Sequence, residues 1–156
     1  MFLDIKIVAV GKIKNQEILS LVKEYQKRLS PFCKLEILEL SAIPFLRESD
    51  KLKSKKKEGE KILTYIMKND TENFFLLDEN GKECSSVDFS KKLEKVSGRI
   101  TFIVAGTLGF SDEIKKLQLQ KISLSQMTFP HEIARLLLFE QIYRAISILN
   151  KKQYHY

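Results

Sequence analysis

The chain has 156 residues, the size of a single domain that buries about two thirds of its unfolded surface around one core. With 44% apolar and 10% aromatic residues, its composition excludes disordered and fibrous proteins, and a net charge of +7 favours a polyanionic partner such as RNA. Its two cysteines are too few for a zinc site or a disulfide framework and fit a reducing cytoplasm. Because no apolar stretch reaches about 18 residues, we expect a cytoplasmic protein that is neither exported nor inserted in a membrane.

Hydrophobic periodicity predicts five strands that alternate with helices. The first strand, residues 3–10, is mostly apolar, which is typical of a strand covered on both faces, and a helix with one apolar stripe follows until Pro31. Further strands are predicted at 35–40, 74–77, 100–104 and 122–124, and further helices at 47–67, at 86–96, from 111 and at 133–149. This order predicts a single α/β domain over residues 1–156, with a mainly parallel sheet of five or six strands and helices on both faces.

Two of the predicted helices have unusual polarity. Residues 51–61 include six lysines, which form either a solvated helix face or a stripe that contacts RNA phosphates. The last helix, residues 133–149, is apolar nearly all round, so it must be buried on more than one side. Its second cover is either the chain's own core or another copy of the chain, and we expect a C2 homodimer.

Ligands of open parallel sheets bind beyond the carboxyl ends of the strands, so the strand-to-helix loops are the candidate sites. Gly11 lacks the two further glycines of a nicotinamide-binding turn. The loops 78–82 and 105–110 contain glycines that let the backbone approach a ligand or simply form turns, and neither loop is a P-loop. The segment 124–131 places Met127 and Phe129 where polar turn residues are usual, so something must cover these side chains.

Polar residues interrupt the last helix and follow it in the tail. Arg135, Glu140 and Arg144 are costly to bury unless paired, and Glu140 and Arg144 have the spacing of a helical ion pair. The tail, residues 151–156, is either frayed or an arm whose lysines and aromatic rings contact a nucleotide.

In combination, these motifs resemble the SPOUT-class methyltransferases, and within them the pseudouridine N3-methyltransferases of large-subunit ribosomal RNA. The resemblance spans nearly the whole chain. It rests on the motifs at 8–12, 24–29, 57–60, 81–82, 85–86, 106–109, 125–131, 140–145 and 154–155. The family pattern differs at two positions, because its first turn glycine is Ala105 here and its basic last residue is Tyr156.

The resemblance implies a C-terminal trefoil knot, which is rare among proteins, with S-adenosyl-L-methionine bound in it. It also implies that the substrate is N3 of a pseudouridine in 23S ribosomal RNA. The implied cofactor site consists of Leu77, Ala105, Gly106, Leu124, Ser125, Gln126, Met127, Thr128 and Phe129.

Methyl transfer to N3 requires an in-line nucleophile that has lost its proton, hence a base or a group that stabilises the anion. We expect His155, delivered by the tail of the same or a partner subunit, to be the base. Tyr154 would position or stack on the nucleotide, and Arg144 and Arg135 would hold the anion or a phosphate. No metal ion is expected. Without a separate RNA-binding domain, the enzyme is expected to recognise a folded surface of the ribosomal RNA, within the assembled ribosome.

Two other functions compete with this interpretation. A ribosome-associated RNA-binding protein without catalysis explains the positive charge but leaves the apolar segment 124–131 without a role. A small-molecule enzyme on a doubly wound sheet lacks any phosphate or nicotinamide signature.

Overall fold

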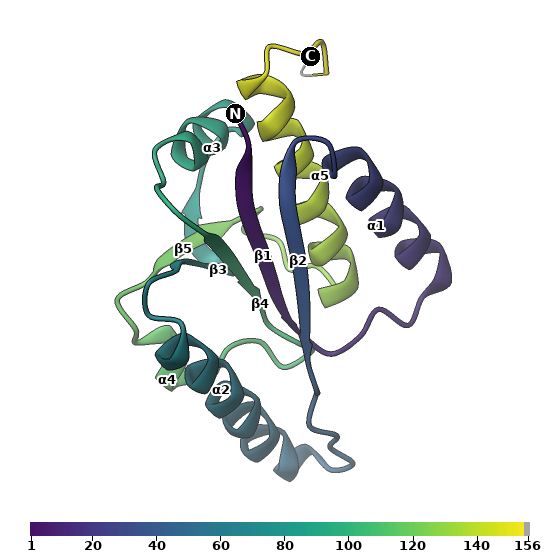
Figure 1. The fold of residues 1–156 in the computed structure, drawn as a ribbon. Helices are drawn as coiled ribbons and strands as arrows, with labels where there is room; N and C mark the ends of the chain where they lie inside the picture. The colour runs from purple at the N-terminus through teal and green to yellow at the C-terminus, as the bar shows by residue number, and fades with distance from the viewer. Residues whose placement is uncertain (155–156) are drawn as a thin grey trace.

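A computed structural model of the protein describes residues 1–154. Over these residues the strands form one parallel sheet in the order β2-β1-β4-β3-β5 (Figure 1). The strands are β1 (Leu3–Val10), β2 (Cys33–Leu40), β3 (Asn73–Glu83), β4 (Ile100–Val104) and β5 (Gln120–Ser123). The predicted parallel α/β fold is therefore confirmed.

The helices cover both faces of the sheet, as predicted (Figure 1). One face carries α1 (Gln16–Leu29), α3 (Ser86–Glu94) and α5 (His131–Leu149), and the other carries α2 (Lys51–Lys68) and α4 (Asp112–Lys115). A short 3-10 helix, η1 (Glu48–Asp50), precedes α2, so the second helix begins later than the sequence predicted. Side-chain caps fix several starts; for example, the Ser85 hydroxyl accepts the backbone N–H of Asp88 at 3.0 Å.

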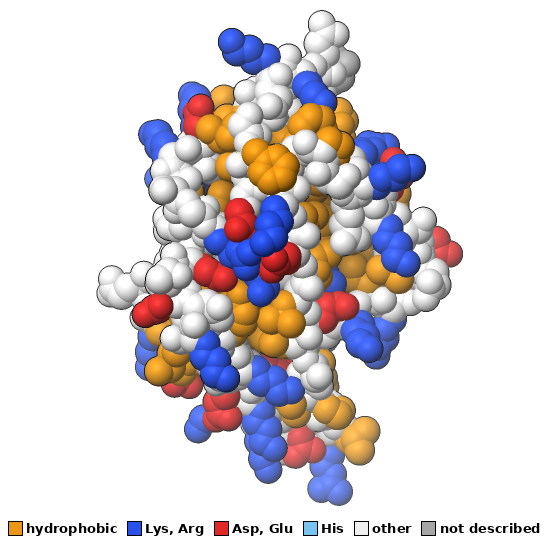
Figure 2. Space-filling view, in the orientation of Figure 1, with side chains coloured by type: hydrophobic (Ala, Val, Ile, Leu, Met, Phe, Trp, Pro, Cys, Tyr) orange, Lys and Arg blue, Asp and Glu red, His pale blue; other side chains and the backbone are white. Residues whose placement is uncertain are grey.

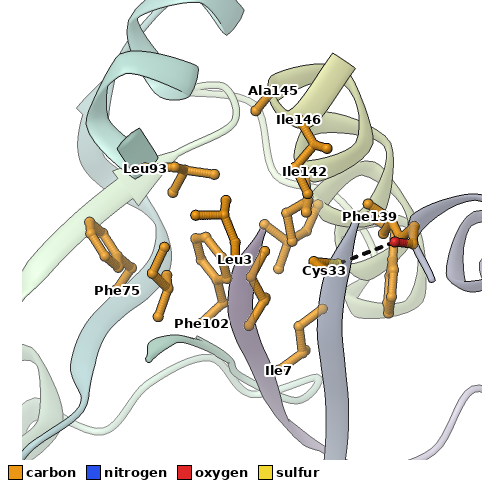
Figure 3. Close-up of a cluster of buried hydrophobic side chains, with 14 of the residues drawn as sticks. Leu3, Ile7, Cys33, Phe75, Leu93, Phe102, Phe139, Ile142, Ala145 and Ile146 are labelled. Carbon is orange, nitrogen blue, oxygen red and sulfur yellow. Dashed lines mark hydrogen bonds between the residues drawn. The ribbon is translucent and has the colours of Figure 1, made fainter. Parts of the chain in front are cut away.

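Alternation along the strands divides the apolar residues between two cores. The larger core lies under α5, where Ile7, Phe75 and Phe102 from the sheet meet Phe139 and Ile142 from the helix (Figure 3). The smaller core lies under α2 and α4 and contains the alternate strand residues, among them Val8 and Ile103. Both faces of the central strands are thus buried, as their apolar sequences indicate.

Strand β3 continues beyond the predicted end at residue 77. Its register against β5 shifts, so that both Leu77 and Lys82 pair with Ile122 while the intervening residues loop out. After the looped-out residues, β3 is able to pair with β5 again because residue 81 is glycine. A Cβ there would lie 2.7 Å from the backbone carbon of Lys121. The segment 78–82, for which the sequence left open a ligand-approaching loop or a simple turn, is therefore held against β5.

Helix α5 lies against the sheet between α1 and α3 (Figure 1), so the chain itself covers much of its apolar surface. A stripe on its outer side, which includes Ile133, Leu137 and Ile148, is only half-buried. The homodimer and the trefoil knot stay predictions. The strand pairings show which strands are neighbours in the sheet, and they test neither prediction. No helix within residues 1–154 has the length and apolarity needed to cross a membrane.

Candidate cofactor site

A cavity of about 590 Å³ opens at the carboxyl ends of β3, β4 and β5. Its walls come from the loops that follow these strands and from the start of α5. Of the nine cofactor residues predicted from the sequence, the structure places eight around this cavity, and Gln126 lies outside the lining with an exposed side chain. The cavity is where an open parallel sheet usually binds its ligand.

The turn after β4 forms one wall and lies close to the end of β1. A Cβ at Gly106 would meet the Val10 side chain at 3.1 Å, so this position leaves little room for a larger residue. Gly109 has a φ of +75°, and its N–H donates to the Gly106 carbonyl at 3.1 Å. Ala105, which replaces the family glycine, has a negative φ and packs against the smaller core, so the methyl group fits without backbone strain.

The apolar segment 124–129 forms the facing wall. Leu124 and Phe129, together with Leu77, separate the cavity from a smaller one of about 220 Å³ behind it. The Ser125 hydroxyl accepts the backbone N–H of Met127 at 3.0 Å and shapes the turn, while the Met127 side chain remains 75% exposed. The segment thus presents an apolar wall to the cavity, and the Met127 side chain on this segment is exposed.

Hydrogen bonds tie this segment to the looped-out residues of β3. The Ser123 hydroxyl donates to the Glu79 carbonyl at 3.0 Å, and the Thr128 hydroxyl donates to the Glu79 carboxylate. Asp78 accepts the backbone N–H of Asn80 at 3.0 Å. The predicted set omitted Asp78 and Glu79, although the unusual turn chemistry of 78–82 was a signal for them.

The polarity and the charge of the lining suit S-adenosyl-L-methionine. The apolar wall suits an adenine ring, and Gly106 allows the backbone to approach a ligand. Two acidic side chains, Asp78 and Glu79, and one cationic side chain, Lys115, line the cavity. These match the sulfonium, the ammonium and the carboxylate of the cofactor. Within residues 1–154, no group of three or more His, Cys, Asp or Glu residues is arranged to hold a metal ion.

His131 begins α5 at the rim of the cavity, with its Nδ1 3.4 Å from the Thr107 hydroxyl. One turn further along α5, Arg135 is turned away from the cavity lining and is buried. Its guanidinium donates to Glu39 at 2.8 Å and to the Gly11 carbonyl at 3.3 Å, and its side chain is 5% exposed. Arg135 thus joins α5 to the ends of β1 and β2.

Arg144 lies near the other end of α5. It forms the predicted helical ion pair with Glu140 at 2.6 Å, and this hydrogen bond raises the pKa of Arg144. Its guanidinium stacks 5.0 Å from the ring of Tyr154, which in turn meets Tyr143 edge-on at 4.7 Å. Burial, together with a hydrogen bond to Tyr154, raises the pKa of Tyr25 to about 12. We call Tyr25, Tyr143 and Tyr154 the aromatic cluster.

The aromatic cluster lies toward the carboxyl end of α5, where Tyr143 meets Tyr154, whereas the cavity lies at the amino end, where His131 and Ala134 line it. The helix has 19 residues and so is roughly 28 Å long at 1.5 Å per residue. The structure therefore does not bring Arg144 and Tyr154 to the cavity of their own chain. His155, the expected base, lies outside the described residues.

A parallel α/β sheet with a cofactor-sized cavity at its carboxyl edge defines a class of ligand-binding domains, and comparison with known proteins defines the family. The family described as "Predicted SPOUT methyltransferase" matches residues 3–155. The chain therefore belongs to the SPOUT methyltransferases, enzymes that use S-adenosyl-L-methionine as the methyl donor.

Relatives match over the full length. "Ribosomal RNA large subunit methyltransferase H" of Enterococcus faecalis is 42% identical, covering 97% of this chain and 98% of the relative. The protein of the same name from Flavobacterium psychrophilum is 40% identical, covering 99% of each chain. A solved structure described as a probable methylase family protein from Haemophilus influenzae Rd KW20 has a TM-score of 0.57 at 13% identity. That match covers 99% of this chain and 71% of the other, and it supports the fold alone.

Proposed function

We propose that this protein methylates N3 of a pseudouridine in the 23S ribosomal RNA of the large subunit. The observation that carries the proposal is the cavity between the Gly106 turn and the apolar segment 124–129, in a chain whose relatives act on large-subunit ribosomal RNA by name. The net charge of +7 suits a polyanionic substrate. The substrate is the folded RNA within the assembled ribosome, in the cytoplasm.

Bound S-adenosyl-L-methionine supplies a methyl group on a sulfonium, a leaving group that needs no metal ion. The chain's own residues hold the cofactor between the Gly106 turn and the segment 124–129 and keep water from the apolar wall. The hydrogen bond between Thr128 and Glu79 fixes the segment 124–129 against the looped-out residues of β3. Catalysis then depends on a base that removes the N3 proton of the pseudouridine.

The catalytic groups come from the far end of α5 of a second subunit. In an antiparallel C2 pair of α5 helices, the carboxyl end of one helix lies beside the amino end of the other. This arrangement would carry Arg144, Tyr154 and His155 of one subunit to the cavity of its partner. The half-buried side chains of Ile133, Leu137 and Ile148, on the side of α5 that also carries Glu140 and Arg144, support such a homodimer, because pairing would remove them from water.

Within this composite site His155 is the base, Tyr154 positions the nucleotide and Arg144 holds the anionic ring or a phosphate. For Arg135 the buried pairing with Glu39 and Gly11 favours a positioning role, in which it fixes the start of α5 beside the cavity.

Two measurements test the proposal. Mass mapping of ribosomal RNA nucleosides should show N3-methylpseudouridine in cells that carry the gene and its loss on deletion. With the purified protein, S-adenosyl-L-methionine at 100 times its Kd should stabilise the fold by about 2.7 kcal/mol. An RNA-binding protein without catalysis would show neither effect, and an unchanged nucleoside map would refute the proposal.

A further inference from the structure

A hollow on α2 lies outside the cofactor site. It has a volume of about 490 Å³ and is formed where the chain leaves β2, turns through residues 43–47 and enters α2. We call it the basic hollow. It is lined by Phe45, Leu46, Arg47, Asp50, Lys53 and Lys57, among others.

Contacts with α2 hold this turn in place. The Ser54 hydroxyl donates to the Pro44 carbonyl at 3.3 Å, and the Lys61 ammonium donates to the Ser41 carbonyl at 2.8 Å. The buried carboxylate of Glu58 accepts the backbone N–H of Ile43, and burial raises its pKa. Since the turn is fixed at several points, the hollow is preformed and a ligand need not order it.

The charges in the basic hollow are unbalanced. Arg47, Lys53 and Lys57 contribute three positive charges against the single carboxylate of Asp50. None of these three cations forms an ion pair within residues 1–154. Arg99, by contrast, reaches three carboxylates. Cations that outnumber the carboxylates of a concave surface are typical of a site for an anion.

The rim of the basic hollow is apolar. Leu46 is 98% exposed, and Phe45 beside it is half-buried with the Lys51 ammonium 5.6 Å from its ring. Apolar and aromatic side chains next to cations are what a nucleotide chain requires, because its bases need a surface to pack on while its phosphates need charge.

The hollow also lies at the end of the molecule that holds the cofactor cavity. The carboxyl end of β2 leads into it, so it extends from the same edge of the sheet as the cofactor cavity (Figure 1). Figure 2 shows Lys and Arg side chains at this end, over the start of α2, with apolar and some acidic side chains among them. A long RNA chain is therefore able to reach both sites.

We infer that the basic hollow binds the sugar-phosphate backbone of ribosomal RNA flanking the target nucleotide. Arg47, Lys53 and Lys57 contact phosphates, and Phe45 and Leu46 pack against a base or ribose. The inference rests on the proposed function and adds to it a docking site that positions the RNA on either side of the target nucleotide.

The first test replaces the three cations together: Arg47→Ala, Lys53→Ala and Lys57→Ala. The matched control is Lys91→Ala, Lys92→Ala and Lys95→Ala, which removes the same charge at the end of α3, where the chain leads to the amino end of β4. Large ribosomal subunits from cells without the gene are the probe.

At moderate salt, the hollow variant should bind the subunits about tenfold or more weakly. The slope of log affinity against log salt should fall by roughly 2 to 3, because each lost phosphate contact removes about 0.7 to 0.9. Its affinity for S-adenosyl-L-methionine and its oligomeric state should match those of the wild type, which shows that it is folded. Equal losses in both variants, an unchanged slope or a change in oligomeric state would each overturn the inference. If the wild type itself neither binds nor methylates subunits, the proposed function fails instead.

A second test keeps all the charges. A photo-crosslinking residue at Leu46 should crosslink to ribosomal RNA, whereas the same residue at Met67, which is 71% exposed at the other end of α2, should not. Absence of the crosslink from position 46, or equal crosslinking from both positions, contradicts an RNA site in the hollow.

Discussion

The two ends of α5 are built in different ways. At the amino end, Arg135 is buried and bonded to two neighbouring strand ends, and the loops around the cavity are fixed by close backbone contacts. At the carboxyl end, Arg144 and Tyr154 are half-buried and are held by one ion pair and by ring contacts. The comparison teaches that two arginines on one helix have different surroundings: Arg135 is buried beside the cavity, whereas Arg144 is partly exposed, as the substrate contact proposed for it requires.

The largest expected effect comes from removing the tail. A chain that ends at Asn150 should still dimerise and bind S-adenosyl-L-methionine but methylate nothing, since it lacks the proposed base. The variant His155→Ala tests that base alone and should lose roughly 10² to 10⁴ in turnover. Single-turnover methylation of large subunits is the measurement. Near-normal activity of the shorter chain would show that the tail is merely frayed.

Alanine substitutions of the two arginines should have opposite effects on stability and on turnover, one lowering mainly the first and the other mainly the second. Arg135→Ala should lower the free energy of unfolding by about 1 to 3 kcal/mol, because it removes a buried side chain that joins α5 to the ends of β1 and β2, while Glu39 stays accessible to water. Arg144→Ala should cost about 0.5 to 1.5 kcal/mol in stability, because its pair with Glu140 is partly buried. Its turnover should nevertheless fall roughly tenfold to a hundredfold, through loss of a cation at the reacting base. Urea unfolding and turnover should be measured on both variants. A larger loss of stability in Arg144→Ala, together with a larger loss of turnover in Arg135→Ala, would contradict the comparison.

Mixed dimers show which subunit the tail serves. One chain ends at Asn150, and the other carries Gly106→Val, which pushes the turn off Val10 and spoils the cavity. Each homodimer is inactive, but random pairing should restore about a quarter of wild-type activity if the tail acts on the partner's cavity. An inactive mixture, in which exchange of subunits is verified by mass spectrometry, would place the tail at its own chain's cavity.

The smallest effect concerns the aromatic cluster. Tyr25 has its pKa raised from 10.0 to about 12, so its neutral form stabilises the folded protein below pH 10. This stabilisation should be lost as the pH rises from 10 to about 12. Tyr25→Phe should remove that part of the pH dependence of unfolding. An identical pH dependence in the two proteins would show that the hydroxyl of Tyr25 makes no such contribution.

What the sequence predicted well depends on short-range patterns. The apolar runs of the strands and the pairing of Glu140 with Arg144 each involve residues close in the chain, and the structure confirms them. The predicted cofactor loops converge because parallel strands place their carboxyl ends at one edge.

What the sequence did not predict depends on residues far apart in the chain. The burial of Arg135 follows from Glu39, which is 96 residues away, and no local pattern reveals that partner. Glu79 is held at the site by Thr128, which is 49 residues away, because β3 pairs with β5 again after the looped-out residues. The basic hollow needs the turn at 43–47 to fold back on α2, whereas the lysines alone also fit a solvated face.

The position of β5 at the outer edge of the sheet has a consequence for synthesis. The neighbours β2, β1, β4 and β3 are all encoded in the first 104 residues, so four strands are able to pair before β5 and α5 have been made. At about 5 to 20 residues per second, the rest of the chain takes roughly 3 to 10 s more. A nascent chain therefore acquires its sheet first and its cofactor cavity last, and until then the apolar surface meant for α5 stays open to chaperones and to aggregation.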